Sequence, residues 1–239
     1  MKVINDIIAS LEGDYSVHEV RSCVFWTAVM SRGCGLASTL RDGGPHHTKK
    51  PVPEAGNLTS KSARELAECA NSDSLPEASI GMAAINSLIE IDRSRCVERN
   101  AFEILKEHGE GRKIAIVGHF PFIPKLRQVA SELWVIEKRP AEGDLPEERA
   151  AEVLGHADVV GITGTSLINH TFEGLIKQCR NSFVVMLGPS TPLSPVLFDY
   201  GVDVLSGVSV NDKGLVLRCI SEGASFRQVE GVELLTMTR

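Results

Sequence analysis

Short apolar runs that alternate with helical patterns fill the second half of the chain. Each run ends at a glycine, a small polar residue or a charge, and the runs lie at residues 113–118, 133–137, 158–162, 182–188 and 202–206. Uninterrupted apolar runs are typical of strands that are buried on both faces. Strands that alternate with helices indicate a parallel sheet with helices on both sides. We therefore predict an α/β domain with a mainly parallel sheet over residues 101–239.

The first hundred residues follow a different order. The pattern predicts a helix at residues 3–11, a β-hairpin at 15–30, a third strand at 36–40 and two helices within 57–71 and 76–89. Strands followed by a group of helices indicate an α+β arrangement. We therefore predict an α+β domain over residues 1–100, before the α/β domain.

The charges do not favour a polyanionic partner. The chain has 239 residues and a net charge of -6, and its lysines and arginines are dispersed. This distribution is not typical of nucleic-acid or membrane-surface binding. The apolar runs are too short to cross a bilayer, and the N-terminus lacks a signal-peptide core. We expect a cytoplasmic protein whose partner is a small-molecule ligand, and the small residues of the helix at 76–89 leave room for a homodimer.

The stretch at residues 158–171 is the strongest candidate for a ligand site. A buried strand turns through Thr163-Gly164-Thr165-Ser166 into a helical pattern that includes Asn169. Small hydroxyl groups and free N–H groups at a helix start suit an anion or a polar ligand edge. In open α/β sheets, ligands bind outside the carboxyl ends of the strands. The alternative is an ordinary turn in which Thr165 or Ser166 caps the helix.

The turns after neighbouring strands are expected to join this site. Parallel strands bring their carboxyl ends to one edge, so residues distant in sequence meet there. His119 is the group best suited to move a proton near neutral pH, although a structural histidine is the alternative. We expect Gly164 to let the backbone approach the ligand. The predicted ligand-binding residues are Thr163, Gly164, Thr165, Ser166, Asn169, Glu137, Ser190 and Thr191, with Arg41 and His46 closing the pocket from the first domain.

The motifs identify no cofactor. Gly118-His119-Phe120-Pro121 stands where a glycine-rich dinucleotide fingerprint would stand, which removes the main support for a dinucleotide. Glu137 ends the next strand, where a ribose-binding acid would lie in a nucleotide or S-adenosylmethionine fold, unless it forms a surface ion pair. The chain has no H-E-x-x-H motif and no zinc-type spacing of Cys and His. We therefore predict no metal ligands and no tightly held zinc.

Three motifs resemble those of a known family. Residues 116–121, 161–169 and 188–195 resemble the "putative heavy-metal chelation" domain family, formerly a domain of unknown function. The first hundred residues look like that family's companion domain. The resemblance implies an N-terminal domain like the enolase N-terminal fold, a Rossmann-like C-terminal domain with some similarity to methyltransferases, and a site between them.

Several functions stay open at this point. The resemblance implies an enzyme that acts on a small polar metabolite. Its reaction would be a condensation or a hydrolysis in the metabolism of a pterin, flavin or siderophore-like chelator. The chain shows no obvious nucleophile–base pair, and a non-catalytic binding protein for a metabolite or a metal complex needs none. An S-adenosylmethionine-dependent methyltransferase, with its cofactor near Glu137, is the third alternative.

Overall fold

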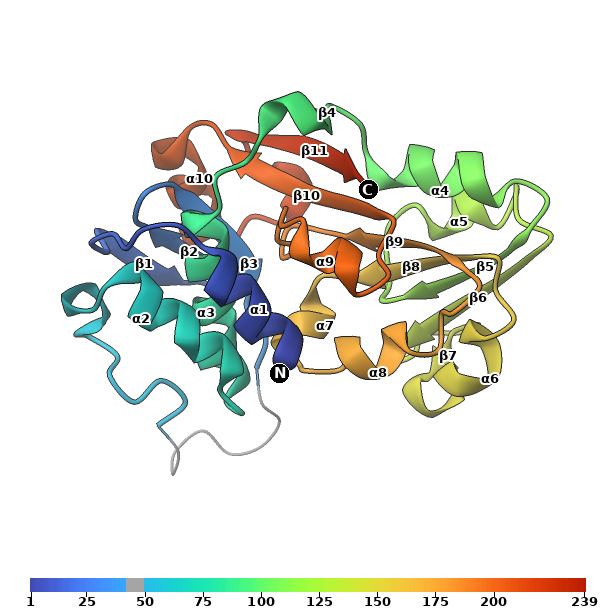
Figure 1. Ribbon diagram of the computed structural model, residues 1–239, viewed down its shortest axis with the longest axis horizontal. Coiled ribbons are helices and arrows are strands. Elements are labelled where there is room, and N and C mark those ends of the chain that lie inside the picture. Colours follow the sequence, from blue (N-terminus) through green and yellow to red (C-terminus); the bar gives the residue numbers. More distant parts are fainter. Residues whose placement is uncertain (42–49) are drawn as a thin grey trace.

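Two β-sheets organise residues 1–41 and 50–239, the part of the chain that this computed structural model describes (Figure 1). The strands are β1 (Glu19–Ser22), β2 (Trp26–Met30), β3 (Cys34–Ser38), β4 (Cys96–Val97), β5 (Lys113–Val117), β6 (Glu132–Glu137), β7 (Leu145–Pro146), β8 (Val159–Thr163), β9 (Phe183–Leu187), β10 (Val204–Val210) and β11 (Val232–Thr238). Within the described residues, the smaller sheet has the order β1-β2-β3, and the larger has the order β4-β11-β10-β9-β8-β5-β6-β7.

Helices surround both sheets. The α-helices are α1 (Lys2–Ser10), α2 (Ala63–Glu68), α3 (Leu75–Leu88), α4 (Ala101–Gly109), α5 (Ile123–Leu126), α6 (Ala150–Leu154), α7 (Thr165–Ile168), α8 (Phe172–Ile176), α9 (Val196–Asp199) and α10 (Lys213–Ser221). Short 3-10 turns are η1 (Leu58–Ser60), η2 (Cys69–Asn71), η3 (Arg93–Arg95), η4 (Glu147–Arg149) and η5 (Phe226–Gln228). Among the described segments, no helix is both long and apolar enough to cross a membrane.

The large sheet is mainly parallel, as predicted. β5 pairs in parallel with β6 and β8, and β9 pairs in parallel with β8 and β10. β11 instead runs antiparallel to β10 and to β4, and the sequence pattern predicts neither β4 nor β11. The chain runs outward from β5 through β6 to β7, then returns to place β8 on the other side of β5. Strand order therefore reverses between β5 and β8, which is where open α/β sheets bind ligands.

Successive residues of β5 pack on opposite faces of the sheet. Ile114 and Ile116 share an apolar core with α4 and α5, whereas Ala115 faces a second core that contains α6, α8 and α9. Figure 1 shows the same division, with α4 and α5 away from α6, α8 and α9. The prediction of helices on both faces is therefore confirmed.

The second core continues into the N-terminal half. Ile4 and Ile7 of α1 and Ile85 of α3 are buried in the same cluster as the residues beneath the large sheet. The small sheet therefore packs against the large one, with α1 beside α9 (Figure 1). β4, which lies before residue 101, pairs with β11 of the large sheet.

The small residues of α3 serve packing within the chain. A Cβ at Gly81 would lie 1.9 Å from the Ala70 N atom of η2, and a Cβ at Gly35 of β3 would lie 2.0 Å from the Ala83 carbonyl oxygen. Glycine at these positions lets the helix backbone approach η2 and the small sheet closely. These residues are therefore covered internally, and the homodimer stays a prediction without this support.

Two predicted helices differ from the structure. The sequence pattern predicts a helix over residues 126–133, and this prediction is wrong, because α5 ends at Leu126 and β6 begins at Glu132. The continuous helix expected after β8 is divided into α7 and α8. His170 lies between them with a φ of 61°, a left-handed conformation that ends a right-handed helix.

The contact between β3 and α3 predicts a sharp effect of Gly35→Ala. The added methyl group would overlap the Ala83 carbonyl oxygen, so backbone must move. We expect the free energy of unfolding to fall by about 3 kcal/mol in urea denaturation. Gly174→Ala is the matched control, because its Cβ would meet no atom within 4 Å. This control should raise the free energy of unfolding by about 0.5–1 kcal/mol, and equal effects of the two substitutions would contradict the packing described.

Candidate functional site

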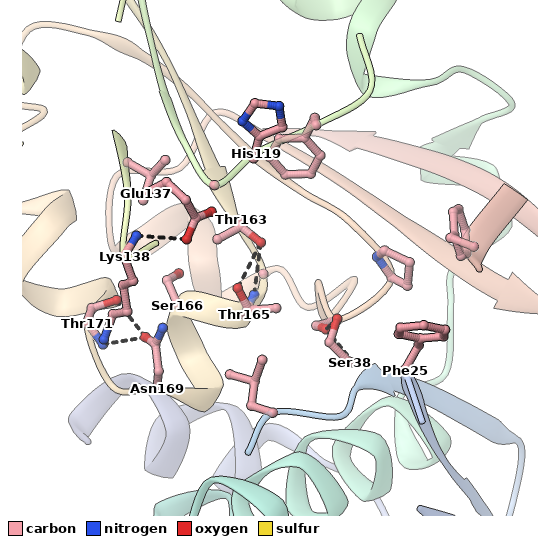
Figure 2. A pocket seen from close by; sticks show the side chains of 18 of the residues that line it. Phe25, Ser38, His119, Glu137, Lys138, Thr163, Thr165, Ser166, Asn169 and Thr171 are labelled. Carbon is pink, nitrogen blue, oxygen red and sulfur yellow. Dashed lines mark hydrogen bonds between the residues drawn. The ribbon is translucent and has the colours of Figure 1, made fainter. Parts of the chain in front are cut away.

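A cavity of about 1770 Å³ lies along the carboxyl edge of β5, β6 and β8, where the small sheet faces the large one (Figure 2). The turns after these strands, the loop after β3 and the turn between β1 and β2 all contribute to its walls. The predicted site residues that line it are Arg41, His119, Glu137, Thr163, Gly164, Thr165, Ser166, Asn169 and Ser190.

One predicted residue of the described chain stands apart from this wall. Thr191 is 2% exposed and does not line the cavity, because it lies behind the turn after β8. Its backbone N–H donates to the Gly188 carbonyl at 2.9 Å, as in a tight turn. His46 lies outside the described residues.

Gly164 lines the cavity, so its approach to a ligand stays a prediction, and it also allows close packing between two turns. A Cβ at this position would lie 2.6 Å from the Thr191 N atom and 2.8 Å from the Ser190 carbonyl carbon. The absent side chain therefore lets the turn after β8 pack directly on the turn after β9. A valine at position 164 would push these two turns apart, so we expect Gly164→Val to disturb the fold as well as the cavity.

The turn after β8 is held by its own hydroxyl groups. The Oγ1 atoms of Thr163 and Thr165 are 3.0 Å apart, and the Thr165 N–H donates to Thr163 Oγ1 at 3.3 Å. α7 begins after Gly164, and no side chain caps it, so the alternative of Thr165 or Ser166 as N-cap is wrong. α7 also has just four residues. A helix this short has a small dipole, so the expected helix-start anion site loses its main support.

Ser166 has a buried hydroxyl group without a partner. The residue is 1% exposed and lines the cavity, yet its Oγ has no hydrogen bond within the part of the chain that the structure describes. Buried polar atoms are nearly always paired, and an unpaired one costs about 1–3 kcal/mol. Figure 2 shows Ser166 on the wall that also carries Thr165 and Asn169. Gln178 Oε1 and Thr191 Oγ1 are the other unpaired buried side-chain atoms among the described residues, and of the two hydroxyl groups only that of Ser166 belongs to a residue that lines the cavity.

Asn169 is held in one orientation. Its Oδ1 accepts hydrogen bonds from the Thr171 N–H at 3.3 Å and from the Thr171 hydroxyl at 2.7 Å. The Asn169 amide Nδ2 makes no hydrogen bond to any described residue. The next residue, His170, donates from Nε2 to the Ala70 carbonyl at 2.9 Å, which ties this turn to the N-terminal half.

Ser190 bridges the two sheets. Its Oγ accepts a hydrogen bond from the Ser38 N–H at 2.9 Å and donates to the Ser38 Oγ at 3.1 Å. Ser190 is 1% exposed, so its hydroxyl has a structural task although it borders the cavity. Ser38, which the sequence analysis did not select, lines the cavity from the end of β3 (Figure 2).

His119 forms a pair with a carboxylate that sequence reasoning missed. His119 Nδ1 and Asp144 Oδ2 are 2.9 Å apart, and the same oxygen accepts a hydrogen bond from the Ala141 N–H at 3.1 Å. The His119 side chain is 49% exposed, whereas that of Asp144 is 3% exposed. Because Nδ1–H faces the carboxylate, the neutral ring keeps Nε2 as its proton acceptor. Asp144 lies in a loop before β7, where its sequence indicates a turn and nothing more.

Cationic side chains outnumber carboxylates around the cavity. Among the described residues that line it, the cationic side chains are Arg41, Lys125, Lys138, Arg139 and Arg227, and the carboxylates are Glu137, Glu147 and Glu148. Lys138 pairs with Glu147 at 3.4 Å, and the Glu137 carboxylate accepts from the Lys138 backbone N–H at 2.8 Å. The whole chain carries -6, so this local excess of positive charge favours an anionic ligand.

The described residues do not gather a metal-binding set. No group of three or more His, Cys, Asp or Glu side chains that could hold a metal ion occurs in residues 1–41 and 50–239. His119 and Glu137 line the same cavity, but they do not form part of such a group. The donor set therefore does not fit a resident heavy metal in the described part of the chain.

The fold and the site define an α/β protein with a cavity at the strand-order reversal of its sheet. Residues 100–238 match the DUF364 family and residues 4–89 match the DUF4213 family, and both families carry the description "Putative heavy-metal chelation". The match at residues 100–238 covers more than half of the chain. The chain therefore belongs to the DUF364 family, as the resemblance in its motifs predicts.

Relatives share nearly the full length of the chain. An uncharacterized protein of Methanocaldococcus jannaschii is 26% identical over 240 residues, which cover 95% of this chain and 91% of that protein. A solved structure of a DUF364 protein with unknown function from Desulfitobacterium hafniense is 28% identical, with a TM-score of 0.88 and coverage of 100% and 98%. Another, from Pyrococcus horikoshii, is 18% identical with a TM-score of 0.82 and the same coverage, and it shows the shared fold.

The unpaired hydroxyl predicts an unusual effect of Ser166→Ala. In the ligand-free protein, removal of a buried hydroxyl without a partner should raise the free energy of unfolding by about 1 kcal/mol. Ser206→Ala is the matched control, because the Ser206 hydroxyl lies 2.8 Å from Thr236 Oγ1 in a buried pair. That control should lower the free energy of unfolding by about 1 kcal/mol. Urea denaturation of both variants measures these changes in the free energy of unfolding. If Ser166→Ala destabilised the protein as much as the control, the Ser166 hydroxyl would not be an unpaired group that is available to a ligand.

The absence of tightly held zinc also stays a prediction. The purified protein should contain far less than one zinc per chain after dialysis, because neither the motifs nor the described residues supply a set of zinc ligands. Elemental analysis of the dialysed protein measures this ratio. One equivalent of zinc per chain would show that the prediction is wrong.

Proposed function

We propose that this protein binds a small anionic metabolite in the cavity between its two sheets and moves a proton on that metabolite with His119. The observation that carries the proposal is that two features line the same cavity. One is an oriented His119–Asp144 pair, and the other is the buried Ser166 hydroxyl that lacks a protein partner. The first supplies a base, and the second is a contact for the ligand.

The residues divide naturally into two tasks. Thr165, Ser166 and the Asn169 amide offer hydrogen bonds to a ligand oxygen, while Lys138 and Arg41 supply positive charge. His119 Nε2 accepts a proton from a ligand group, and Asp144 holds the ring in place as it does so. A positioned base of this kind contributes about 10²–10⁴-fold to a rate. Condensation and hydrolysis both use such a proton transfer.

The family description suggests the metabolic setting. We infer that the metabolite belongs to the chemistry of a pterin, a flavin or a siderophore-like chelator that is linked to heavy metals. In this proposal the metabolite, rather than the protein, holds the metal, because the described residues lack a donor set. We also propose that the N-terminal half is related to the enolase N-terminal fold and that the C-terminal half is Rossmann-like. In this proposal the protein acts in the cytoplasm.

A non-catalytic binding protein is the second candidate, because no cysteine is among the described residues that line the cavity, and the buried thiols elsewhere are unreactive. Burial raises the pKa of the Cys34 thiol to about 11 and that of the Cys179 thiol to about 12. Such thiols are protonated at neutral pH and react slowly. Ser166 likewise has no base within hydrogen-bond distance among the described residues. A binding protein needs neither kind of nucleophile.

A methyltransferase is supported by the place of Glu137. This residue ends β6, the strand beside β5, where a ribose-binding acid of an adenosyl cofactor would lie. The turn after β5 opposes this alternative, because Phe120 and Pro121 stand where glycine would give the cofactor access.

The proposal predicts that His119→Asn abolishes turnover but preserves the fold and ligand binding. Wild-type protein and the variant are incubated with the small-molecule fraction of a cell extract, and untargeted mass spectrometry follows each compound. We expect one compound to be consumed at least ~100-fold more slowly by the variant. Asp144→Asn should slow it less, because it alters the orientation of the base without removing it.

The same experiment separates enzyme from binding protein. Native mass spectrometry shows which compound stays bound to each protein. A compound that both wild type and His119→Asn bind and return unchanged favours the non-catalytic candidate. Consumption at equal rates by both would overturn the role of His119.

A further inference from the structure

The remaining wall of the cavity is apolar and largely aromatic. Sequence reasoning selected polar residues at this edge of the sheet and missed this wall. The residues that define the wall, here called the aromatic wall, are Phe25, Trp26, Phe120, Phe122, Phe226 and Leu234. Phe25 is 51% exposed and Leu234 is 43% exposed, and both line the cavity. Neighbouring exposed apolar side chains in a cavity indicate a surface that an apolar ligand group covers.

Hydrogen bonds hold Phe25 in its exposed position. The Cys23 N–H donates to the Trp26 carbonyl at 2.9 Å, which closes the turn between β1 and β2. The Thr39 N–H donates to the Phe25 carbonyl at 2.9 Å, and the Trp26 indole Nε1–H donates to the Ala224 carbonyl at 3.0 Å. The Trp26 ring also packs on Phe226, with centroids 5.4 Å apart. The turn therefore presents Phe25 to the cavity from a fixed backbone (Figure 2).

The aromatic wall begins directly beside the hydroxyl-bearing turn after β8. A Cβ at Gly118 would lie 3.1 Å from Thr163 Cβ and 3.3 Å from Phe120 Cε2, so both side chains border the space beside Gly118. Phe120 in turn stacks on Phe122, with centroids 5.2 Å apart and an interplanar angle of 9°. A molecule that contacts the hydroxyl-bearing turn therefore extends onto the Phe120 ring without leaving the cavity.

We propose that the ligand is an amphipathic anion with an aromatic body. Its carboxylate, phosphate or sulfonate head contacts Ser166 and Lys138, and its body lies against Phe25 and Phe120. This inference rests on the proposed function, since it specifies the ligand of the same cavity. A wholly polar metabolite would fill the part of the cavity around Ser166 but would leave Phe25 and Leu234 in water.

The two tryptophans of the chain make the test direct. Trp26 lines the cavity, whereas Trp134 lies in β6 beneath the Lys113 amine. Trp134→Phe leaves Trp26 as the single fluorescent tryptophan. Energy transfer from Trp26 then reports a fluorescent ligand in the cavity. The probe is 8-anilinonaphthalene-1-sulfonate, and N-phenyl-1-naphthylamine is the matched control that has the same body without the sulfonate.

We expect one 8-anilinonaphthalene-1-sulfonate to bind per chain, with an affinity at least about tenfold higher than that of the uncharged control. Phe25→Ala should weaken binding of both compounds at least about fivefold, because both lose a contact for the body. Ser166→Ala should weaken binding of the sulfonate alone. Val97→Ala is the control variant, because Val97 is 55% exposed but lies outside the cavity, and it should change neither affinity.

Two results would overturn the inference. One is equal binding of the sulfonate by wild type and by Phe25→Ala. The other is an equal loss of affinity in Phe25→Ala and Val97→Ala, which would mark unspecific adhesion to exposed apolar groups. Methanesulfonate, a head without a body, distinguishes this failure from failure of the proposed function. If it protects against urea denaturation in wild type more than in Ser166→Ala, the anion site stands while the aromatic body is rejected.

Discussion

β5 and β8 are neighbours in the large sheet, but the chain leaves their carboxyl ends toward opposite faces. β5 leads to α5, whose Leu126 packs on one side of the sheet, and β8 leads to α7 and α8, whose Leu167 and Phe172 pack on the other. Two turns that diverge in this way cannot fill the space between them. The cavity, the exposure of His119 and the position of Ser166 all depend on this divergence.

The main features of the fold were predictable because buried strands and helices each impose a characteristic spacing of apolar residues on the sequence. β5, β6, β8 and β9 have their counterparts in apolar runs, and the helices between them follow a different period. β11 was not predicted, because Val232–Thr238 mixes polar and apolar residues and lacks the uninterrupted apolar run of the parallel strands. α5 was misplaced because its few residues carry too little periodicity to define its bounds.

The candidate site was predictable for residues that follow strands directly. Thr163, Ser166 and Glu137 are positioned by the sheet itself, so knowing the strands was enough to bring them to one edge. Asp144 and Phe25 are positioned by contacts across the fold, and no local pattern distinguishes them from residues of ordinary turns. The packing role of Gly164 could not be predicted for the same reason, since it depends on a contact with Thr191 in a separate turn.

The cavity takes its walls from both halves of the chain, and this division has an evolutionary consequence. His119 and Ser166 come from the half that matches DUF364, whereas Phe25 and Ser38 come from the half that matches DUF4213. If the ligand spans both, the reacting groups lie in one half, whereas both halves supply the surface for the ligand body, because Phe120 and Phe226 also belong to the DUF364 half. Substitution of Phe25 among relatives would then change how the ligand body fits without touching His119 or Ser166.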